Sequence, residues 1–305
     1  MHAAAELDEI RTSEEARPSA WKRIKELVAY REILMNLIRK EVKVKYTSSK
    51  LGATWSMLNP LLYLAVFSLV FGVILKSKAP DFAVYLLSGL LAWSFFSNAL
   101  GLSARSVVDN ANLVKKVYLP REVLPLASVG ASLVDFFLQT IVLLIFMGAM
   151  GHFVMGTNLL LLPLSFIALF IFTCALSLWV GALNVRYRDT QHLLSLALLA
   201  WFWFTPIVYA SAFLQDRLQA HGDWLWYGYL ALNPMADIVI GFQRAIYGEV
   251  CPGAVVRATR ECQLVQASVG AEAIVIGAVA IGSVFLLYLF WRHFFKLSGD
   301  FAEEL

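Results

Sequence analysis

The chain has 305 residues, of which 59% are hydrophobic and 15% are charged, and its mean hydropathy is +0.67. Soluble domains carry about 45–50% apolar and about 25% charged residues, so this composition indicates an integral membrane protein. The net charge of +3 is too small to indicate binding to nucleic acid, and we expect no nucleic-acid partner.

The first 20 residues form a polar tail whose acidic side chains do not match the positive start of a signal peptide. In residues 21–46, apolar side chains recur at helical spacing with basic residues between them. This pattern predicts an amphipathic helix that lies along the membrane surface. An ordinary cytoplasmic helix with a solvated face is the alternative.

Six segments have the roughly 20 mostly apolar residues that a helix needs to cross the hydrocarbon core. They predict an all-α fold whose six-span region covers residues 54–292, followed by a short tail at 293–305. The predicted spans are residues 54–75, 82–104, 125–150, 159–183, 192–213 and 270–291. Six spans place both termini on the same side of the membrane.

Basic residues are distributed unevenly between the two sides of this topology. Nineteen Lys and Arg residues lie on the side of the termini, and six lie on the other side. Because loops in the cytoplasm carry the excess of Lys and Arg, both termini are predicted to be cytoplasmic. The chain is therefore predicted to be a multi-pass protein of the cell membrane (the inner or plasma membrane).

The third predicted span contains a stripe of polar residues. Ser128, Ser132, Asp135 and Gln139 are spaced four, three and four residues apart, which places them on one helix face. A carboxylate near the bilayer centre costs on the order of 2.5–3.5 kcal/mol, so Asp135 should not face lipid. Two interpretations remain open: the stripe lines a transport path, or it forms a seam between packed helices.

Aromatic residues are concentrated in the second span at residues 91–98 and in the fifth at residues 201–209. Aromatic faces can stack on sugar rings, so these side chains could line a path for a glycan. The alternative is that they fill space between helices as bulky packing residues. The candidate path residues are Trp93, Phe96, Trp201 and Phe204, together with Ser132, Asp135 and Gln139.

The external segment 215–269 is rich in aromatic and apolar residues but is interrupted by Asn233, Pro234 and Asp237. It predicts two short helices that enter the outer interface without spanning the membrane. Cys251 and Cys262 lie in the same segment. A disulfide between them and two unpaired thiols are both open interpretations.

The sequence contains no cluster of metal ligands, no nucleophile elbow and no P-loop. Catalysis by this chain is therefore not expected, and neither is a cofactor bound to it. If the protein performs work, another protein must supply the energy.

Four stretches resemble the ABC-2 type permeases that export lipid-linked polysaccharides such as O-antigen, wall teichoic acid and galactan. They are residues 43–74, 113–136, 181–209 and 232–248, and they follow the order of the family. The resemblance covers about residues 21–292. The chain departs from the family in its acidic amino-terminal tail and in the insert from Cys251 to Cys262.

The resemblance implies a homodimer that works with two copies of a separate ABC ATPase subunit, on which ATP and magnesium bind. The implied substrate is a lipid-linked polysaccharide carried within membrane lipid. Gate helices are implied between the fifth and sixth spans, with Trp224, Trp226, Asn233 and Asp237 as candidate gate residues. The competing functions are an ABC-2 exporter of drugs or small lipids and a membrane-embedded acyltransferase that modifies glycans.

The resemblance also implies that the polar segment at residues 112–125 is a coupling helix that docks on the ATPase. Pro120 and Pro125 predict helix boundaries there. The expected contact residues are Asn112, Lys115, Lys116, Tyr118, Pro120, Arg121 and Glu122. The alternative is that the segment only anchors the topology. The loop with Arg186, Arg188 and Asp189 is predicted to be a second contact or a brace for the amino-terminal helix, unless its charges pair locally.

Overall fold

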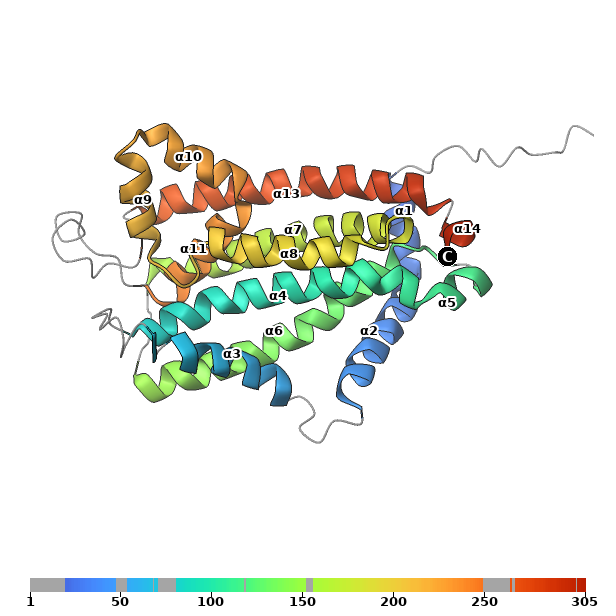
Figure 1. Cartoon of the computed structure of the whole chain (residues 1–305), viewed down its shortest axis with the longest axis horizontal. Coiled ribbons are helices and arrows are strands. Elements are labelled where there is room, and N and C mark those ends of the chain that lie inside the picture. Colours follow the sequence, from blue (N-terminus) through green and yellow to red (C-terminus); the bar gives the residue numbers. More distant parts are fainter. Residues whose placement is uncertain are drawn as a thin grey trace, which may run out of the picture.

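The structure is a computed structural model that describes residues 20–47, 54–67, 69–70, 81–117, 119–151, 156–248, 264, 267–299 and 301–305. The long helices of the described chain lie side by side along one direction and form a bundle (Figure 1). These are α4 (Phe82–Asp109), α6 (Val123–Met150), α7 (Leu161–Arg186) and α13 (Val269–Ser298).

Shorter helices complete the described part of the chain. They are α1 (Ala20–Ala29), α2 (Arg31–Tyr46), α3 (Thr54–Phe67), α5 (Ala111–Lys116), the 3-10 helix η2 (Thr157–Leu160), α8 (Thr190–Phe204), α9 (Ser211–Gln219), α10 (Asp223–Leu232), α11 (Pro234–Ile246) and α14 (Phe301–Glu304).

Four helices of the described chain are long and apolar enough to cross a membrane: α4, α6, α7 extended by η2, and α13. They have 28 or 30 residues each, so they are roughly 42–45 Å long at 1.5 Å per residue. Each corresponds to a predicted span: the second, third, fourth and sixth. Each continues past the predicted boundary at the end that carries basic residues, because a helix does not stop where its side chains become polar.

The first and fifth predicted spans correspond to shorter helices. α3 has 14 residues, and much of the rest of that predicted span lies outside the described residues. α8 has 15 residues and ends at Phe204. The prediction of one continuous helix over 192–213 is therefore wrong. Pro206 disfavours helical backbone at the residue before it, and the chain turns there before α9 begins.

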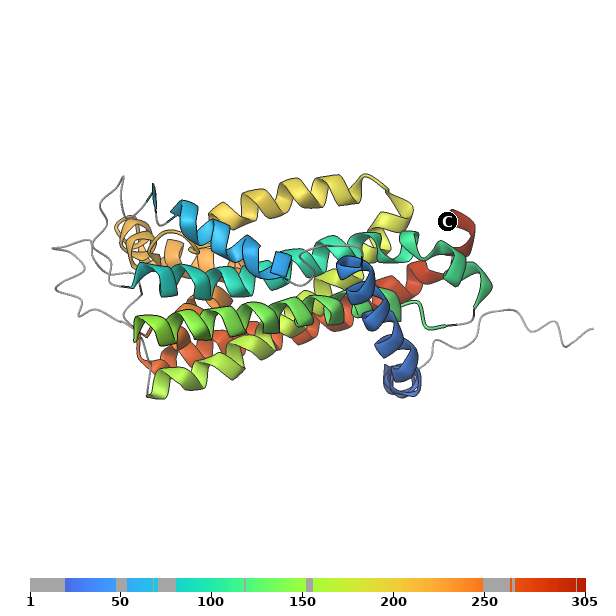
Figure 2. The ribbon, with the colours of Figure 1, turned by 90° about the horizontal axis from the view of Figure 1, so that it is seen from below.

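The predicted amphipathic helix consists of two helices, α1 and α2, that meet at Tyr30. α2 crosses the long helices instead of running along them (Figures 1 and 2). It packs on α6, with Leu37 buried. An amphipathic helix crossing one end of the bundle in this way has the orientation predicted for a helix along the membrane surface.

Gly130 of α6 permits the close approach of α2. A Cβ atom at this position would lie 2.5 Å from Ile38 Cδ1 and 2.8 Å from Ile38 Cγ1. We expect Gly130→Val to destabilise the protein by about 1–3 kcal/mol through overpacking. Ile38→Ala in the same chain should recover part of this loss, as measured by thermal unfolding in detergent. A double variant no more stable than Gly130→Val would contradict the proposed contact.

The external segment differs from its prediction. Its described part holds most of α9 and all of α10 and α11, and α11 is buried among the long helices. Residues 235–246 are all buried, with α11 packed on α4, α7 and α13. Two buried polar side chains of α11 have partners inside the protein, which lowers the cost of burying them: Gln243 Nε2 donates to the Pro206 carbonyl oxygen at 3.1 Å, and Arg244 pairs with Glu272 at 3.7 Å.

The end of the chain is also more ordered than the predicted tail at 293–305. α13 continues to Ser298, and α14 then folds back onto the bundle. Phe301 is fully buried and its ring meets the Phe294 ring edge-on, with the centroids 5.4 Å apart. α14 packs on α5 and α7, so the carboxyl terminus lies beside the polar segment between α4 and α6.

Candidate coupling segment and translocation groove

The first half of the predicted coupling segment is exposed on α5, at one end of the bundle (Figure 1). Val114 faces inward and is buried, whereas Asn112, Lys115 and Lys116 are exposed. Asn110 fixes the start of this segment: its side chain accepts a hydrogen bond from Lys40 Nζ of α2 at 2.6 Å. α5 therefore exposes two lysine side chains, and α2 contacts the residue at which α5 begins.

The second half of the segment faces the protein interior, which corrects the expectation that its charges are displayed. Glu122 is 2% exposed, and Trp291 Nε1 of α13 donates to its Oε1 at 3.3 Å. The Arg121 guanidinium lies 5.9 Å from the centre of the Phe301 ring. Pro120 is buried as well, and Tyr118 lies outside the described residues.

Partial burial also affects the pKa of Arg121. Desolvation lowers the pKa of its guanidinium, and the neighbouring Glu122 carboxylate acts in the opposite direction. Arginine nevertheless stays protonated at neutral pH because its ordinary pKa lies far above neutrality. Arg121 and Glu122 are neighbours in the chain, and their contacts connect the start of α6 to α14 and α13.

The second loop, after α7, is exposed at Arg186, Arg188 and Asp189. The Arg186 guanidinium lies 5.7 Å from the centre of the Tyr187 ring. Among the described residues, none of the three charges forms an ion pair, so the alternative of local pairing is not observed there. The loop lies at the same end of the bundle as α5 (Figure 1).

Asp135 lies in the contact between α2 and α6, so the interpretation of the stripe as a seam between packed helices describes this residue. Its Oδ2 lies 2.6 Å from Lys45 Nζ, and its Oδ1 accepts a hydrogen bond from the Tyr46 hydroxyl. Both partners are in the last turn of α2. The carboxylate is therefore the anchor that fixes the surface helix α2 to α6.

The other members of the polar stripe have separate roles. The Ser132 hydroxyl donates to the Ser128 carbonyl oxygen at 3.0 Å, a bond within its own helix. Gln139 is 8% exposed, and its buried Oε1 has no hydrogen-bond partner among the described residues. The stripe is one helix face but not one continuous polar path.

Most of the candidate aromatic path residues pack inside the bundle. The fully buried Phe96 ring stacks on Phe172 with centroids 5.7 Å apart, and Trp201 meets Phe96 edge-on at 5.3 Å. Phe204 is 68% exposed at the end of α8. Trp93, 7% exposed, packs on Phe202 of α8. Phe96 and Trp201 therefore fill space between helices, which was the second interpretation of the aromatic residues.

A groove of about 380 Å³ lies between α3, α4 and α8. Trp93 lines it together with residues that were not singled out from the sequence. Its aromatic lining is Tyr63, Phe67, Trp93, Phe202 and Trp203, and its polar lining is Ser94, Ser97, Asn98 and Ser195. Hydroxyl and amide groups beside aromatic faces make a surface that can both stack on rings and form hydrogen bonds.

The candidate gate residues divide into exposed and buried ones. Trp224 is 72% exposed, whereas Trp226 is 4%, Asn233 is 6% and Asp237 is 2% exposed. Asn233, between α10 and α11, connects them to α8. Its Oδ1 accepts from Trp201 Nε1 at 2.7 Å, and its Nδ2 donates to the Phe204 carbonyl oxygen at 3.2 Å. Cys251 and Cys262 lie outside the described residues.

A bundle of membrane-length helices, crossed at one end by a helix with an apolar face, defines a multi-pass membrane protein. Residues 33–247 match the model of the ABC-2 type transporter family, and the chain belongs to this family.

Curated relatives carry names from polysaccharide transport. The chain is 34% identical to the O-antigen export system permease protein RfbA of Myxococcus xanthus over 76% of its own length and 86% of that protein. It is 30% identical to the protein of the same name from Klebsiella pneumoniae, over 70% and 79% of the two lengths. It is also 24% identical to the polysialic acid transport protein KpsM of Escherichia coli, over 67% and 76%.

Proposed function

We propose that this chain is the permease subunit of an ABC transporter that exports a lipid-linked polysaccharide across the cell membrane. A separate ATPase subunit, which binds ATP and magnesium, supplies the energy. The family membership supports separate permease and ATPase subunits, and the names of the relatives support a polysaccharide as the cargo.

The groove between α3, α4 and α8 is the observation that carries this proposal. A glycan passing through a bilayer loses its hydrogen bonds to water, and each unsatisfied group costs several kcal/mol in hydrocarbon. Ser97, Asn98 and Ser195 can replace some of these bonds, while Tyr63 and Trp203 offer flat faces for the sugar rings. A drug or small lipid would need fewer polar groups along its path.

The proposed assembly contains two copies of the chain, each with six spans and with both termini in the cytoplasm. α3 and α8 supply the two spans beyond the four long helices. α8 also has an apolar exposed surface at Leu193 and Leu196, and the exposed Leu199 beside them lines the groove. A second copy facing the groove would cover this surface and close the path, and α9 and α10 would form the external gate.

In the proposed mechanism, the ATPase docks on Asn112, Lys115 and Lys116 of α5. Closure of the two ATPases on ATP moves this segment, and contacts inside the permease transmit the movement. Glu122 passes it to α13 through Trp291, and Arg121 passes it to α14 through Phe301. The two copies then part to admit the glycan to the groove while its lipid stays in the bilayer.

Depletion of the protein tests the cargo. We expect lipid-linked glycan precursors to accumulate on the cytoplasmic side, measured by lipid extraction and mass spectrometry. Cells that accumulate no such precursor would exclude polysaccharide export.

Filling the groove tests the path. We expect Ser97→Phe to reduce glycan export at least tenfold, because the larger ring occupies the groove, while the ATPase still co-purifies. Ile145→Phe adds a ring at a position of α6 that is 68% exposed and away from the groove, so it should leave export unchanged. Export at the normal rate in Ser97→Phe would place the path elsewhere.

A further inference from the structure

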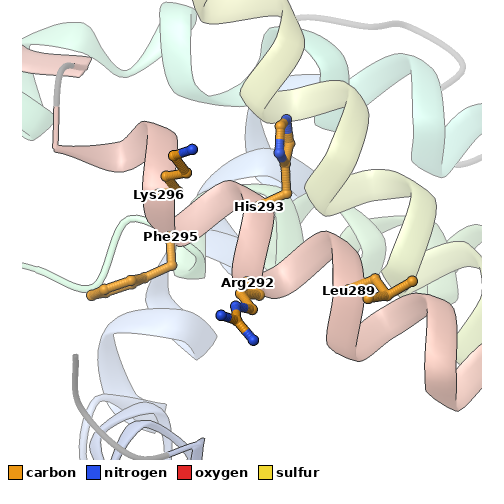
Figure 3. A pocket seen from close by; sticks show the side chains of 5 residues that line it. All are labelled: Leu289, Arg292, His293, Phe295 and Lys296. Carbon is orange, nitrogen blue, oxygen red and sulfur yellow. The ribbon is translucent and has the colours of Figure 1, made fainter.

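The last two turns of α13 carry three basic side chains around a cavity of about 460 Å³. Arg292, His293 and Lys296 line it together with Leu289 and Phe295 (Figure 3). The export mechanism proposed above uses none of these residues.

The spacing of these residues places them together. Positions 289, 292, 293 and 296 follow the pattern i, i+3, i+4, i+7, so they lie along one broad face of the helix, with 292 and 293 at its two edges. That face is roughly 10 Å long at 1.5 Å per residue. Figure 3 shows Lys296 and His293 extending toward one edge of this face, Arg292 extending toward the other, and Leu289 further along the helix.

The positive charges of this cluster are not neutralised by the described part of the chain. Other cations have carboxylate partners: Lys45 pairs with Asp135 at 2.6 Å, and Arg244 pairs with Glu272 at 3.7 Å. No carboxylate of the described residues pairs with the three basic residues of α13, all of which are exposed. Within the described part of the chain, the cluster therefore keeps positive charge that attracts an anion.

The position of the cluster indicates which anion it meets. The three residues follow the apolar part of a helix long enough to cross the membrane, so they lie at the level of the lipid headgroups. Basic pockets at this level bind anionic headgroups. A guanidinium can bind two phosphate oxygens at once, and Lys296 adds a flexible point charge.

The packing of α13 distinguishes a membrane lipid from the transported one. α13 packs along α7 and α11, whereas the translocation groove lies between α3, α4 and α8. In Figure 2, α8 and α13 lie toward opposite sides of the bundle. A lipid on α13 is thus at the flank of the protein and separate from the groove.

We propose that Arg292, His293 and Lys296 bind the phosphate of an anionic phospholipid of the membrane, with Leu289 in contact with its acyl chain. The cavity is then a lipid site on the flank of the permease, and its occupancy does not depend on which glycan is exported.

The test measures lipid binding to the purified full-length protein in detergent by native mass spectrometry. The probes are phosphatidylglycerol, phosphatidylcholine and inorganic pyrophosphate. We expect the protein to retain phosphatidylglycerol at least tenfold better than phosphatidylcholine, and R292Q/K296Q to lose this preference. The matched control is R39Q/K43Q, which removes the same charge from two exposed positions of α2 and should change binding less than threefold.

Two results would overturn the proposal. Equal loss in R292Q/K296Q and R39Q/K43Q would show that any basic residue near the membrane has the same effect. Displacement of phosphatidylglycerol by an equal concentration of pyrophosphate would show that the cluster binds a free anion. If R292Q/K296Q does not fold, Lys296→Gln alone should weaken binding about threefold, and unchanged binding in this variant would also overturn the site.

Discussion

Lys115→Glu combined with Lys116→Glu is expected to release the partner ATPase while the permease remains folded. Both side chains are exposed on α5, and neither forms an ion pair with a described residue. Reversing both charges places like charges against a partner surface that is complementary to lysine, and such contacts cost several kcal/mol. We expect association to weaken about 100-fold, equivalent to about 2.8 kcal/mol, measured by co-purification and by titration of the purified subunits.

R39E/K43E is the control for this variant, because it reverses two exposed charges on α2 without touching α5. It should retain the ATPase at the normal level. Reversal of Glu122 cannot serve as a docking test, since Glu122 is buried against Trp291 and its loss would disturb the permease itself. Normal co-purification of the ATPase with K115E/K116E would mean that the partner does not bind α5.

Sequence alone predicted the features that depend on local composition. Long apolar runs located α4, α6, α7 and α13, because the thickness of the bilayer fixes the length that a span needs. The mixture of apolar and basic residues located α1 and α2, because a helix along the membrane surface needs one apolar and one basic face. Pro206 lies just after the end of α8. Proline is tolerated often enough in membrane helices that its presence alone does not predict a helix end there.

The sequence could not predict contacts between distant residues. Glu122 and Trp291 are 169 positions apart, and Lys45 and Asp135 are 90 apart. Exposed and buried charges look identical in a sequence, so Glu122 was grouped with the lysines of α5. The segment that contains α11 is too short and too interrupted to predict a span, so the sequence predicts an interfacial helix there. The partners that allow its burial come from the turn after α8, for Gln243, and from α13, for Arg244.

The structure gives the amino-terminal helix a specific role. α2 contacts the base of α5 through Lys40 and Asn110, and it contacts the middle of α6 through Lys45, Tyr46 and Asp135. In the proposed mechanism, movement of the coupling segment would therefore reach α6 by two routes, directly along the chain and through α2. The integrity of the anchor at Asp135 should matter for stability and for transport alike.

Lys45→Met is expected to destabilise the protein more than Asp135→Asn, although the two residues form one pair. The Asp135 side chain is 4% exposed and that of Lys45 is 42% exposed. Removing Lys45 takes away the cation that lies 2.6 Å from this buried carboxylate, and loss of one partner of a buried pair costs about 3–5 kcal/mol. Removing the carboxylate leaves a lysine that can extend toward the headgroups, so Asp135→Asn should cost only about 1–2 kcal/mol.

A double-mutant cycle separates this explanation from a general loss of packing. In K45M/D135N neither charge remains, so the double variant should be about 1–3 kcal/mol more stable than Lys45→Met alone. Tyr46→Phe removes one hydrogen bond but no charge and should cost about 1 kcal/mol. Thermal unfolding in detergent measures all four variants. If Lys45→Met and Asp135→Asn destabilise equally and their effects add in the double variant, Asp135 is not a buried charge that depends on Lys45, and the anchor between α2 and α6 rests on Gly130 and the apolar contacts instead.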